Sequence, residues 1–223
     1  MLEEIDAERV DAIWCLGDTV GYGPRPNACC DAVMARADLC LVGNHDLVVL
    51  GELAVSDFND EAAAAALWTA EVLKPKSRSF LENLKPFDEA RGVDLYHASA
   101  RDPVWEYVLT EEAARATLEL SDAPVVLVGH SHVALAITLD GTDVLGGVAA
   151  GGSEITLEGR WLLNPGSVGQ PRDGDARAAW LLLDLEGKSA VFRRVEYSVV
   201  ETQREMRERG LPPALVARLA HGE

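Results

Sequence analysis

Side chains able to bind a metal ion follow four apolar segments of the sequence, in three cases directly after a glycine. They are Asp18, Asn44, His45, Asp46, His97, His130 and His132. In open α/β sheets, ligands bind beyond the carboxyl ends of the strands, so we expect these side chains to meet at one rim. Of the five histidines in the chain, only His221 lies outside this group.

Carboxylate, amide and imidazole groups together suit divalent transition metals such as Mn²⁺, Fe²⁺, Zn²⁺ or Co²⁺. His130 and His132 are two residues apart, so both would face one site if their strand stays extended through them. A carboxylate such as Asp18 can bridge two ions about 3.5–4 Å apart. The four cysteines lie outside the group and form no Cys-x-x-Cys pair. We therefore expect reduced thiols and no closed structural zinc site.

Taken one at a time, these features have ordinary structural explanations. A Gly-Asp pair after a strand, as at Asp18, usually makes a turn, and a single histidine such as His97 is more often a core or rim residue. Two histidines at one strand end, and the run from Gly43 to Asp46, are harder to explain without a ligand. The four features in similar contexts together predict a metal site.

The composition is that of a folded protein with an acidic surface. The chain has 223 residues, of which 48% are hydrophobic and 26% charged, so we expect one domain spanning residues 1–223 with a sizeable core. Lys and Arg number 20 against 37 Asp and Glu, which gives a net charge of −17. This charge argues against nucleic acid as a partner.

Since no apolar stretch is long enough for a membrane span and no signal sequence opens the chain, we expect a cytoplasmic protein without a membrane partner.

The first half of the sequence alternates between strand-like and helical segments, and the second half reads as hairpins. We expect strands over 12–17, 38–43, 93–98 and 125–132, and helices over 27–37, 59–73, 110–120 and 199–209, with Asn27, Asn59 and Thr110 as N-caps and Pro75 ending the second helix. From Ala134 onward, alternating segments separated by glycines predict antiparallel strands. This order predicts an α/β fold in which mixed sheets are layered with helices.

At these residues the chain resembles the calcineurin-like metallophosphoesterase superfamily. The matching pieces are Gly17-Asp18, the run 43–46, His97 after a strand and the run 129–132. Segments 17–27, 101–108 and 164–178 further resemble the small bacterial and archaeal phosphodiesterase-like subgroup. The resemblance covers nearly the whole chain. It implies two mixed β-sheets packed as a sandwich, flanked by helices, with two metal ions at one rim.

The resemblance also implies a role for each matching residue. Asp18 would bridge the two ions, and one metal site would be completed by Asn44, His97 and His130. His132 would serve the other ion. A metal-bridging hydroxide would attack phosphorus in line with the leaving group.

On the substrate side, the resemblance makes His45 a general acid or a phosphate contact, oriented by Asp46. The substrate side could also be lined by a loop that contains Asn164, Gly166, Ser167 and Arg172. A simple turn explains that loop equally well, so both explanations stay open.

One motif of the family is absent from this sequence. The family begins with a strand ending in Asp-x-His, which supplies two ligands to the first metal site, whereas residues 1–9 here look like the tail of the helix that would follow it. Two explanations stay open. Met1 is an internal codon of a longer reading frame, or the chain is a shortened relative that binds one ion or none tightly. In the second case, unpaired sheet edges would favour a homo-oligomer.

The resemblance implies metal-dependent hydrolysis of a small phosphate ester, by a phosphodiesterase or a phosphatase. The alternative is a catalytically degenerate scaffold of the same fold that binds other proteins. The missing motif favours the scaffold, whereas His45 and Asp46 favour the enzyme because a scaffold needs no general acid. Some relatives are nucleases, but the absence of a basic stripe argues against nonspecific tracking along DNA.

Overall fold

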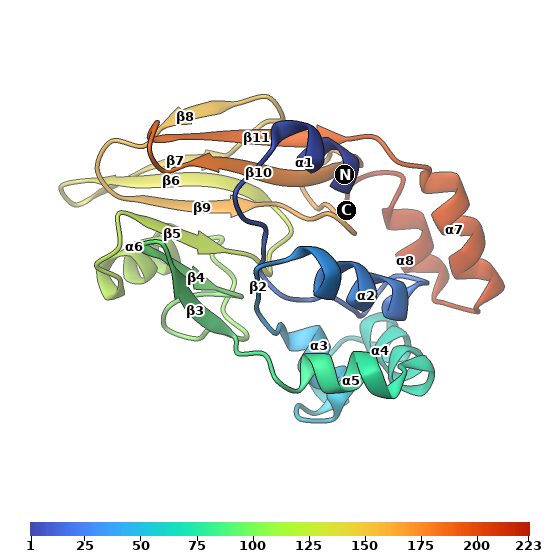
Figure 1. The fold of residues 1–223 in the computed structure, drawn as a ribbon. Coiled ribbons are helices and arrows are strands. Elements are labelled where there is room, and N and C mark those ends of the chain that lie inside the picture. Colours follow the sequence, from blue (N-terminus) through green and yellow to red (C-terminus); the bar gives the residue numbers. More distant parts are fainter.

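The computed structural model describes residues 1–223 as an α/β fold of three sheets and eight α-helices (Figure 1). The helices are α1 (Leu2–Glu8), α2 (Pro26–Arg36), α3 (Asn44–Leu50), α4 (Asp60–Val72), α5 (Pro75–Leu81), α6 (Glu111–Leu120), α7 (Val199–Glu208) and α8 (Pro213–Arg218), with a short 3-10 helix, η1, at Val55–Asp57. The strands are β1 (Trp14–Cys15), β2 (Leu39–Cys40), β3 (Phe87–Ala90), β4 (Val93–Tyr96), β5 (Val125–Val128), β6 (Ala134–Asp140), β7 (Asp143–Val148), β8 (Glu154–Thr156), β9 (Trp161–Pro165), β10 (Ala178–Asp184) and β11 (Ser189–Val195). No helix combines the length and the apolar character that a membrane span needs.

The strands form three sheets, where the sequence analysis predicted two mixed ones. A six-stranded mixed sheet has the order β3-β4-β5-β9-β6-β7, and a three-stranded antiparallel sheet has the order β10-β11-β8. Strands β1 and β2 form a separate parallel pair of two residues each. Because β1 pairs with β2 alone, this pair does not continue into either larger sheet. The predicted α/β class is confirmed, and the number and type of the sheets are corrected.

One apolar core joins side chains from all three sheets. Leu95 of β4 and Leu163 of β9 are buried together with Phe192 of β11, and Trp14 of β1 packs against the same cluster. Burying a side chain of this size stabilises the fold by roughly 1.5–3 kcal/mol. The shared core therefore fixes the ends of these strands relative to one another.

Six of the eight helices, all except α1 and α6, form two groups beside the sheets (Figure 1). Helices α2 to α5 lie together below the sheets in Figure 1, whereas α7 and α8 lie to one side of them. A second apolar cluster fills the first group and includes Cys30 of α2, Val49 of α3 and Leu81 of α5. Ala65 of α4 and Met206 of α7 belong to one further cluster, which connects the two groups.

Local sequence signals predict the start of two helices correctly. The side chain of Asn59 accepts a hydrogen bond of 2.9 Å from the backbone N–H of Ala62 at the start of α4. Thr110 accepts one of 3.2 Å from Ala113 at the start of α6. Both are N-caps, because each side-chain oxygen satisfies a backbone donor that has no partner within the helix.

The predicted cap of α2 is wrong, and Pro75 begins a helix that the sequence analysis did not predict. Asn27 does not cap α2, because Pro26 takes the first helical position and Asn27 lies inside the helix. Its side chain instead donates to the carbonyl oxygen of Val72 at 2.9 Å and accepts from the N–H of Lys74 at 2.8 Å. Helix α4 already ends at Val72, and Pro75 begins α5, where its fixed φ suits a first turn.

The strand predicted over 125–132 ends at Val128. His130 and His132 both have left-handed backbone conformations, with φ values of 57° and 61°, so the expectation of an extended segment through both is wrong. Non-glycine residues adopt this conformation only where surrounding contacts hold it. One such contact comes from Asn164, whose amide donates to the carbonyl oxygen of Gly129 at 2.6 Å.

Candidate metal centre

Asp18 lies in a tight turn after β1, at a φ of 52°. One of its carboxylate oxygens, Oδ1, accepts a hydrogen bond of 2.9 Å from the backbone N–H of His45 in α3. The other oxygen, Oδ2, is buried and has no hydrogen-bond partner. Burial raises the pKa of this carboxyl to about 7, because the charged form has lost its hydration. A bound cation would satisfy the unpartnered oxygen.

His97 directly follows β4 and is buried. Its Nδ1 lies 2.7 Å from the carbonyl oxygen of Leu16, and because a carbonyl only accepts, Nδ1 carries the proton. Burial lowers the pKa of His97, so the ring is neutral and Nε2 has a free lone pair. That nitrogen faces Oδ1 of Asn44 at 3.3 Å and Oδ2 of Asp18 at 3.5 Å.

His130 comes from the turn after β5. Its Nε2 lies 3.2 Å from the carbonyl oxygen of Trp105 and therefore donates, which leaves Nδ1 as the free lone pair. Nδ1 is buried and has no partner. Burial lowers the pKa of His130 to about 3, and the ring of Tyr107 stacks on the imidazole with 4.0 Å between centroids. His130 is thus held neutral, with one nitrogen available to a ligand.

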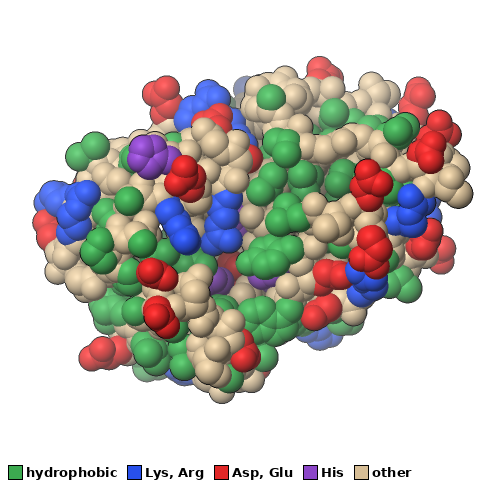
Figure 2. Space-filling view, turned by 180° about the vertical axis from the view of Figure 1, so that it is seen from behind, with side chains coloured by type: hydrophobic (Ala, Val, Ile, Leu, Met, Phe, Trp, Pro, Cys, Tyr) green, Lys and Arg blue, Asp and Glu red, His purple; other side chains and the backbone are tan.

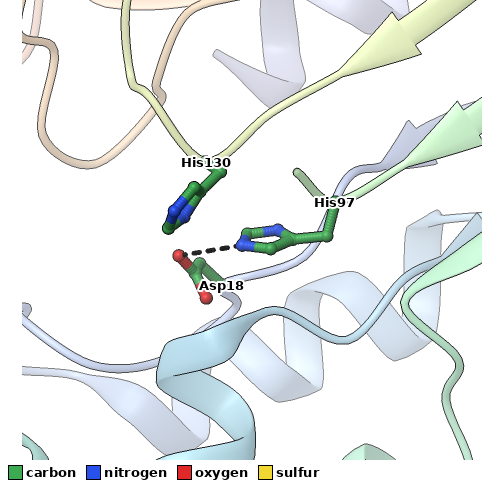
Figure 3. Close-up of side chains that lie close together, drawn as sticks. All are labelled: Asp18, His97 and His130. Carbon is green, nitrogen blue, oxygen red and sulfur yellow. Dashed lines mark ion pairs between the residues drawn. The ribbon is translucent and has the colours of Figure 1, made fainter. Parts of the chain in front are cut away.

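These three side chains converge from the ends of β1, β4 and β5 (Figure 3). Asp18, His97 and His130 each offer a ligand atom, and these atoms all lie within 4.8 Å of one another. The repulsion between two imidazole lone pairs and a carboxylate oxygen that face one another is relieved by a proton on Asp18, whose pKa is raised to about 7, or by a cation between them. Carboxylate and imidazole donors suit a divalent transition metal. The residues present therefore fit such an ion, and the amide oxygen of Asn44 lies beside them.

His132 lies at the same rim, but its ligand atoms are outside this group. Its Nδ1 donates to the carbonyl oxygen of Gln170 at 2.8 Å, so its Nε2 keeps a lone pair. Burial lowers the pKa of His132 to about 3. Its ring meets that of Tyr22 edge to face, with 6.4 Å between centroids. His132 therefore adds a further neutral imidazole to this rim, outside the group of Asp18, His97 and His130.

The ring of His45 lies between two aromatic side chains. The centroid distances are 4.2 Å to Tyr22 and 4.4 Å to Phe58. Nδ1 of His45 is buried without a partner, and burial lowers the pKa of the ring well below its usual value of 6.5. The ring is neutral, and packing with Tyr22 and Phe58 orients it.

Asp46 has a different contact from the one predicted. Its carboxylate accepts hydrogen bonds from the backbone N–H groups of Gly43 at 3.0 Å, Val20 at 3.0 Å and Thr19 at 3.3 Å. It makes no hydrogen bond to the ring of His45, so the prediction that Asp46 orients this ring is corrected. Instead, Asp46 ties the turn after β1 to the start of α3, which holds Asp18 close to Asn44.

The loop predicted to line the substrate side divides into two parts. Asn164 is fully buried, and besides its bond to Gly129 it donates to the hydroxyl of Ser131 at 3.0 Å and accepts from the N–H of Gly166 at 2.9 Å. The hydroxyl of Ser167 accepts from the N–H of Gln170 at 3.0 Å. These contacts are those of a turn that supports residues 129–132.

Arg172, the fourth predicted residue, reaches the rim. Its guanidinium donates to the side-chain oxygen of Gln170 at 2.9 Å and to the hydroxyl of Tyr22 at 3.2 Å. The backbone N–H of Arg172 donates to the carbonyl oxygen of His132 at 3.0 Å, and the positive charge of its guanidinium adds to the effect of burial in lowering the pKa of His132. Figure 2 shows histidine side chains in a hollow on this face, bordered by basic and hydrophobic side chains.

The sequence analysis missed five residues that contact the predicted ones. They are Tyr22, Phe58, Trp105, Tyr107 and Gln170. Four of these, all except Phe58, stand in segments 17–27, 101–108 and 164–178, which carry the family resemblance and were the available signal. Their ring contacts depend on loops that are distant in sequence, so periodicity gives no indication of them.

The chain was also compared with known proteins. Residues 1–188 match the family model described as the calcineurin-like phosphoesterase superfamily domain. An uncharacterized protein of Methanocaldococcus jannaschii, MJ0912, is 33% identical over 227 residues, which cover 100% of this chain and 91% of that protein.

Two solved structures are similar over the whole chain. A metallophosphoesterase from Sphaerobacter thermophilus has 40% sequence identity and a TM-score of 0.90, with 100% of this chain and 93% of that chain covered. The hypothetical protein PH1004 from Pyrococcus horikoshii OT3 has a TM-score of 0.79 at 18% sequence identity, with 100% of this chain and 91% of that chain covered. This similarity shows a shared fold. On the family match and these relatives together, the chain belongs to the calcineurin-like phosphoesterase superfamily.

Proposed function

We propose that this protein hydrolyses a small phosphate ester at a divalent metal centre. The observation that carries the proposal is the convergence of buried ligand atoms from Asp18, His97 and His130. Family membership supports the same chemistry. When bound, a divalent cation polarises the phosphoryl group and lowers the pKa of a bound water.

The ligand set that we propose is Asp18, Asn44, His97 and His130. We further propose that His132 would help to hold a second ion at this rim. The support is the free lone pair on Nε2 of His132, which results from its hydrogen bond to Gln170. Elemental analysis of the purified protein distinguishes one ion from two.

We propose that Arg172 binds the phosphate group of the substrate. A guanidinium pairs with phosphate oxygens through parallel hydrogen bonds, and Gln170 and Tyr22 hold this one from two sides. His45 would contact the substrate through its neutral ring, which Tyr22 and Phe58 hold in place. A small ester suits the net charge of −17, which repels a long polyanion such as nucleic acid.

The test is hydrolysis of nitrophenyl phosphate mono- and diesters by the full chain loaded with Mn²⁺. We expect turnover that depends on the metal and is lost in Asp18→Asn, together with loss of bound metal. Asp31→Asn is the matched control, because Asp31 is an exposed carboxylate paired with Lys76 at 2.7 Å. If the folded, metal-loaded protein shows no turnover on any ester, the enzymatic proposal is wrong. A folded protein with no bound metal would point to the protein-binding scaffold instead.

A further inference from the structure

Two cysteines lie side by side behind the candidate metal centre. Cys15 of β1 and Cys40 of β2 are directly opposite each other in the parallel pair. Their neighbours Trp14 and Leu39 pack against the large apolar core. Successive side chains of a strand point to opposite faces. The thiols of Cys15 and Cys40 therefore point away from that core, on the opposite face of the two-stranded pair.

The two thiols share one polar neighbour. The hydroxyl of Thr19 lies 4.0 Å from Sγ of Cys15 and 3.7 Å from Sγ of Cys40. The Cys40 thiol donates to the carbonyl oxygen of Leu41 at 3.3 Å. The proximity of the two thiols lowers the pKa of Cys15 and raises the pKa of Cys40. Both cysteine residues are half-buried. The pair thus joins a thiol whose thiolate form, the nucleophile in disulfide formation, is favoured to a second sulfur directly opposite it in the strand pair.

We propose that Cys15 and Cys40 form a reversible disulfide when the protein meets a hydroperoxide. The Cys15 thiolate attacks the peroxide oxygen, breaking the O–O bond to give a sulfenic acid and releasing hydroxide or alkoxide, which takes up a proton. The Cys40 sulfur then attacks the sulfenic sulfur, forming the S–S bond. The Cys40 proton and the sulfenic OH leave as water, so the two sulfurs lose two electrons to the peroxide.

The backbone permits this bond. Neighbouring strands lie about 4.7–4.9 Å apart, which falls within the Cα separation of about 4.4–6.8 Å found across disulfides. The pair has only two residues in each strand and is followed by Gly17 and Gly43, so few ladder hydrogen bonds oppose a small adjustment. Thr19, which touches both sulfurs, also donates its N–H to Asp46, placing the thiol pair directly behind the turn that carries Asp18.

The experiment treats the full-length protein with hydrogen peroxide and maps its thiols by mass spectrometry without reduction. We expect the number of free thiols to fall from four to two, with recovery of all four on treatment with dithiothreitol. Digestion with trypsin and with a protease that cleaves after Asp18 separates Cys15 from Cys29 and Cys30. The disulfide should link the peptide containing Cys15 to the peptide containing Cys40.

Three serine variants make the assignment specific. Cys15→Ser and Cys40→Ser should each abolish the link, whereas Cys29→Ser should retain it, because Cys29 lies on α2, outside the strand pair, and as an exposed thiol is an alternative partner. A link from Cys15 to Cys29, oxidation of Cys15 to sulfinic acid without a link, or no loss of thiols would overturn the proposal. None of these readouts uses phosphoesterase activity, so the result is independent of the proposed function.

Discussion

At the scale of single residues, the candidate metal centre depends on which nitrogen of each histidine ring carries the proton. The carbonyl oxygens of Leu16, Trp105 and Gln170 each accept from one nitrogen of a histidine, which fixes the tautomer. The opposite nitrogen of each ring is then unprotonated, because burial keeps all three rings neutral. The backbone thus prepares the imidazoles as ligands before any ion binds.

Gly43 shows how tightly this site is packed. A Cβ at this position would overlap Oδ1 of Asp18 and lie 2.6 Å from its backbone nitrogen. We expect Gly43→Ala to lower the free energy of unfolding by about 1–3 kcal/mol, as overpacking does, and to weaken Mn²⁺ binding. Denaturation and metal titration measure both effects. The control is Gly23→Ala, because a Cβ there meets no atom within 4 Å, and equal losses in both variants would contradict the explanation.

The prediction on substrate binding concerns Arg172. Arg172→Lys keeps the charge but loses the planar contact with Gln170 and Tyr22. We expect KM for a nitrophenyl ester to rise about tenfold, equivalent to about 1.4 kcal/mol, with a smaller change in kcat. Arg36→Lys, at the exposed ion pair with Asp6, should leave both constants unchanged. An unchanged KM in Arg172→Lys would show that Arg172 does not bind the phosphate group of the substrate.

At the scale of elements, the turn between β9 and β10 connects the rim to the three-stranded sheet. Asp175 accepts from the backbone N–H of Arg177 at 3.0 Å and from its side chain at 2.9 Å, while Arg194 of β11 donates to the carbonyl oxygen of Asp175 at 3.3 Å. The hydrogen bond with the Arg177 side chain lowers the pKa of Asp175 to about 2. The turn is therefore held partly by a carboxylate that stays charged in mild acid.

This shift predicts how stability depends on pH. Because the pKa of Asp175 is lower in the folded protein than its usual value of 3.8, its charge stabilises the fold above about pH 4, and this contribution is lost as the pH falls toward about 2. Asp175→Asn keeps the turn acceptor and removes the charge. We expect it to cost about 0.2–1 kcal/mol near neutral pH, since the pair is partly exposed. Urea unfolding should show the two proteins converging in acid, and a constant difference would contradict this account.

At the scale of the whole molecule, the centre should couple metal binding to stability. Its ligands come from residues far apart in the sequence, so unfolding separates them and metal binds the folded state preferentially. At a free Mn²⁺ concentration about 100 times Kd, linkage adds about 2.7 kcal/mol. For a chain of this length, that raises the melting temperature by about 5–10 °C.

Calorimetry with and without Mn²⁺ tests this coupling. Wild-type protein should show the rise in melting temperature, and Asp18→Asn should not, whereas Asp31→Asn should behave like wild type. Mg²⁺ serves as a second comparison, because it prefers oxygen ligands and an octahedral shell of water. A metal-independent melting temperature in the wild type would mean that these residues do not bind Mn²⁺.

The amino-acid sequence determined which residues reach the rim and which elements carry them. Polar residues after buried strands predicted the meeting of Asp18, His97 and His130, and the side chains of Asn59 and Thr110 predicted the start of two helices. Such signals are local, because capping and strand termination depend on residues a few positions apart.

Only the tertiary structure decided how these side chains are held. Arg172 meets Tyr22 across 150 positions and His97 meets Leu16 across 81, while Asp46 bonds to the backbone rather than to the neighbouring His45 ring. Which partner a buried polar group finds depends on loops that fold over it, and desolvation then forces the best available pairing. The hydrophobic periodicity of a sequence does not indicate which partner a buried polar group will find. The orientation of the ligand side chains is therefore decided by how the loops pack over them.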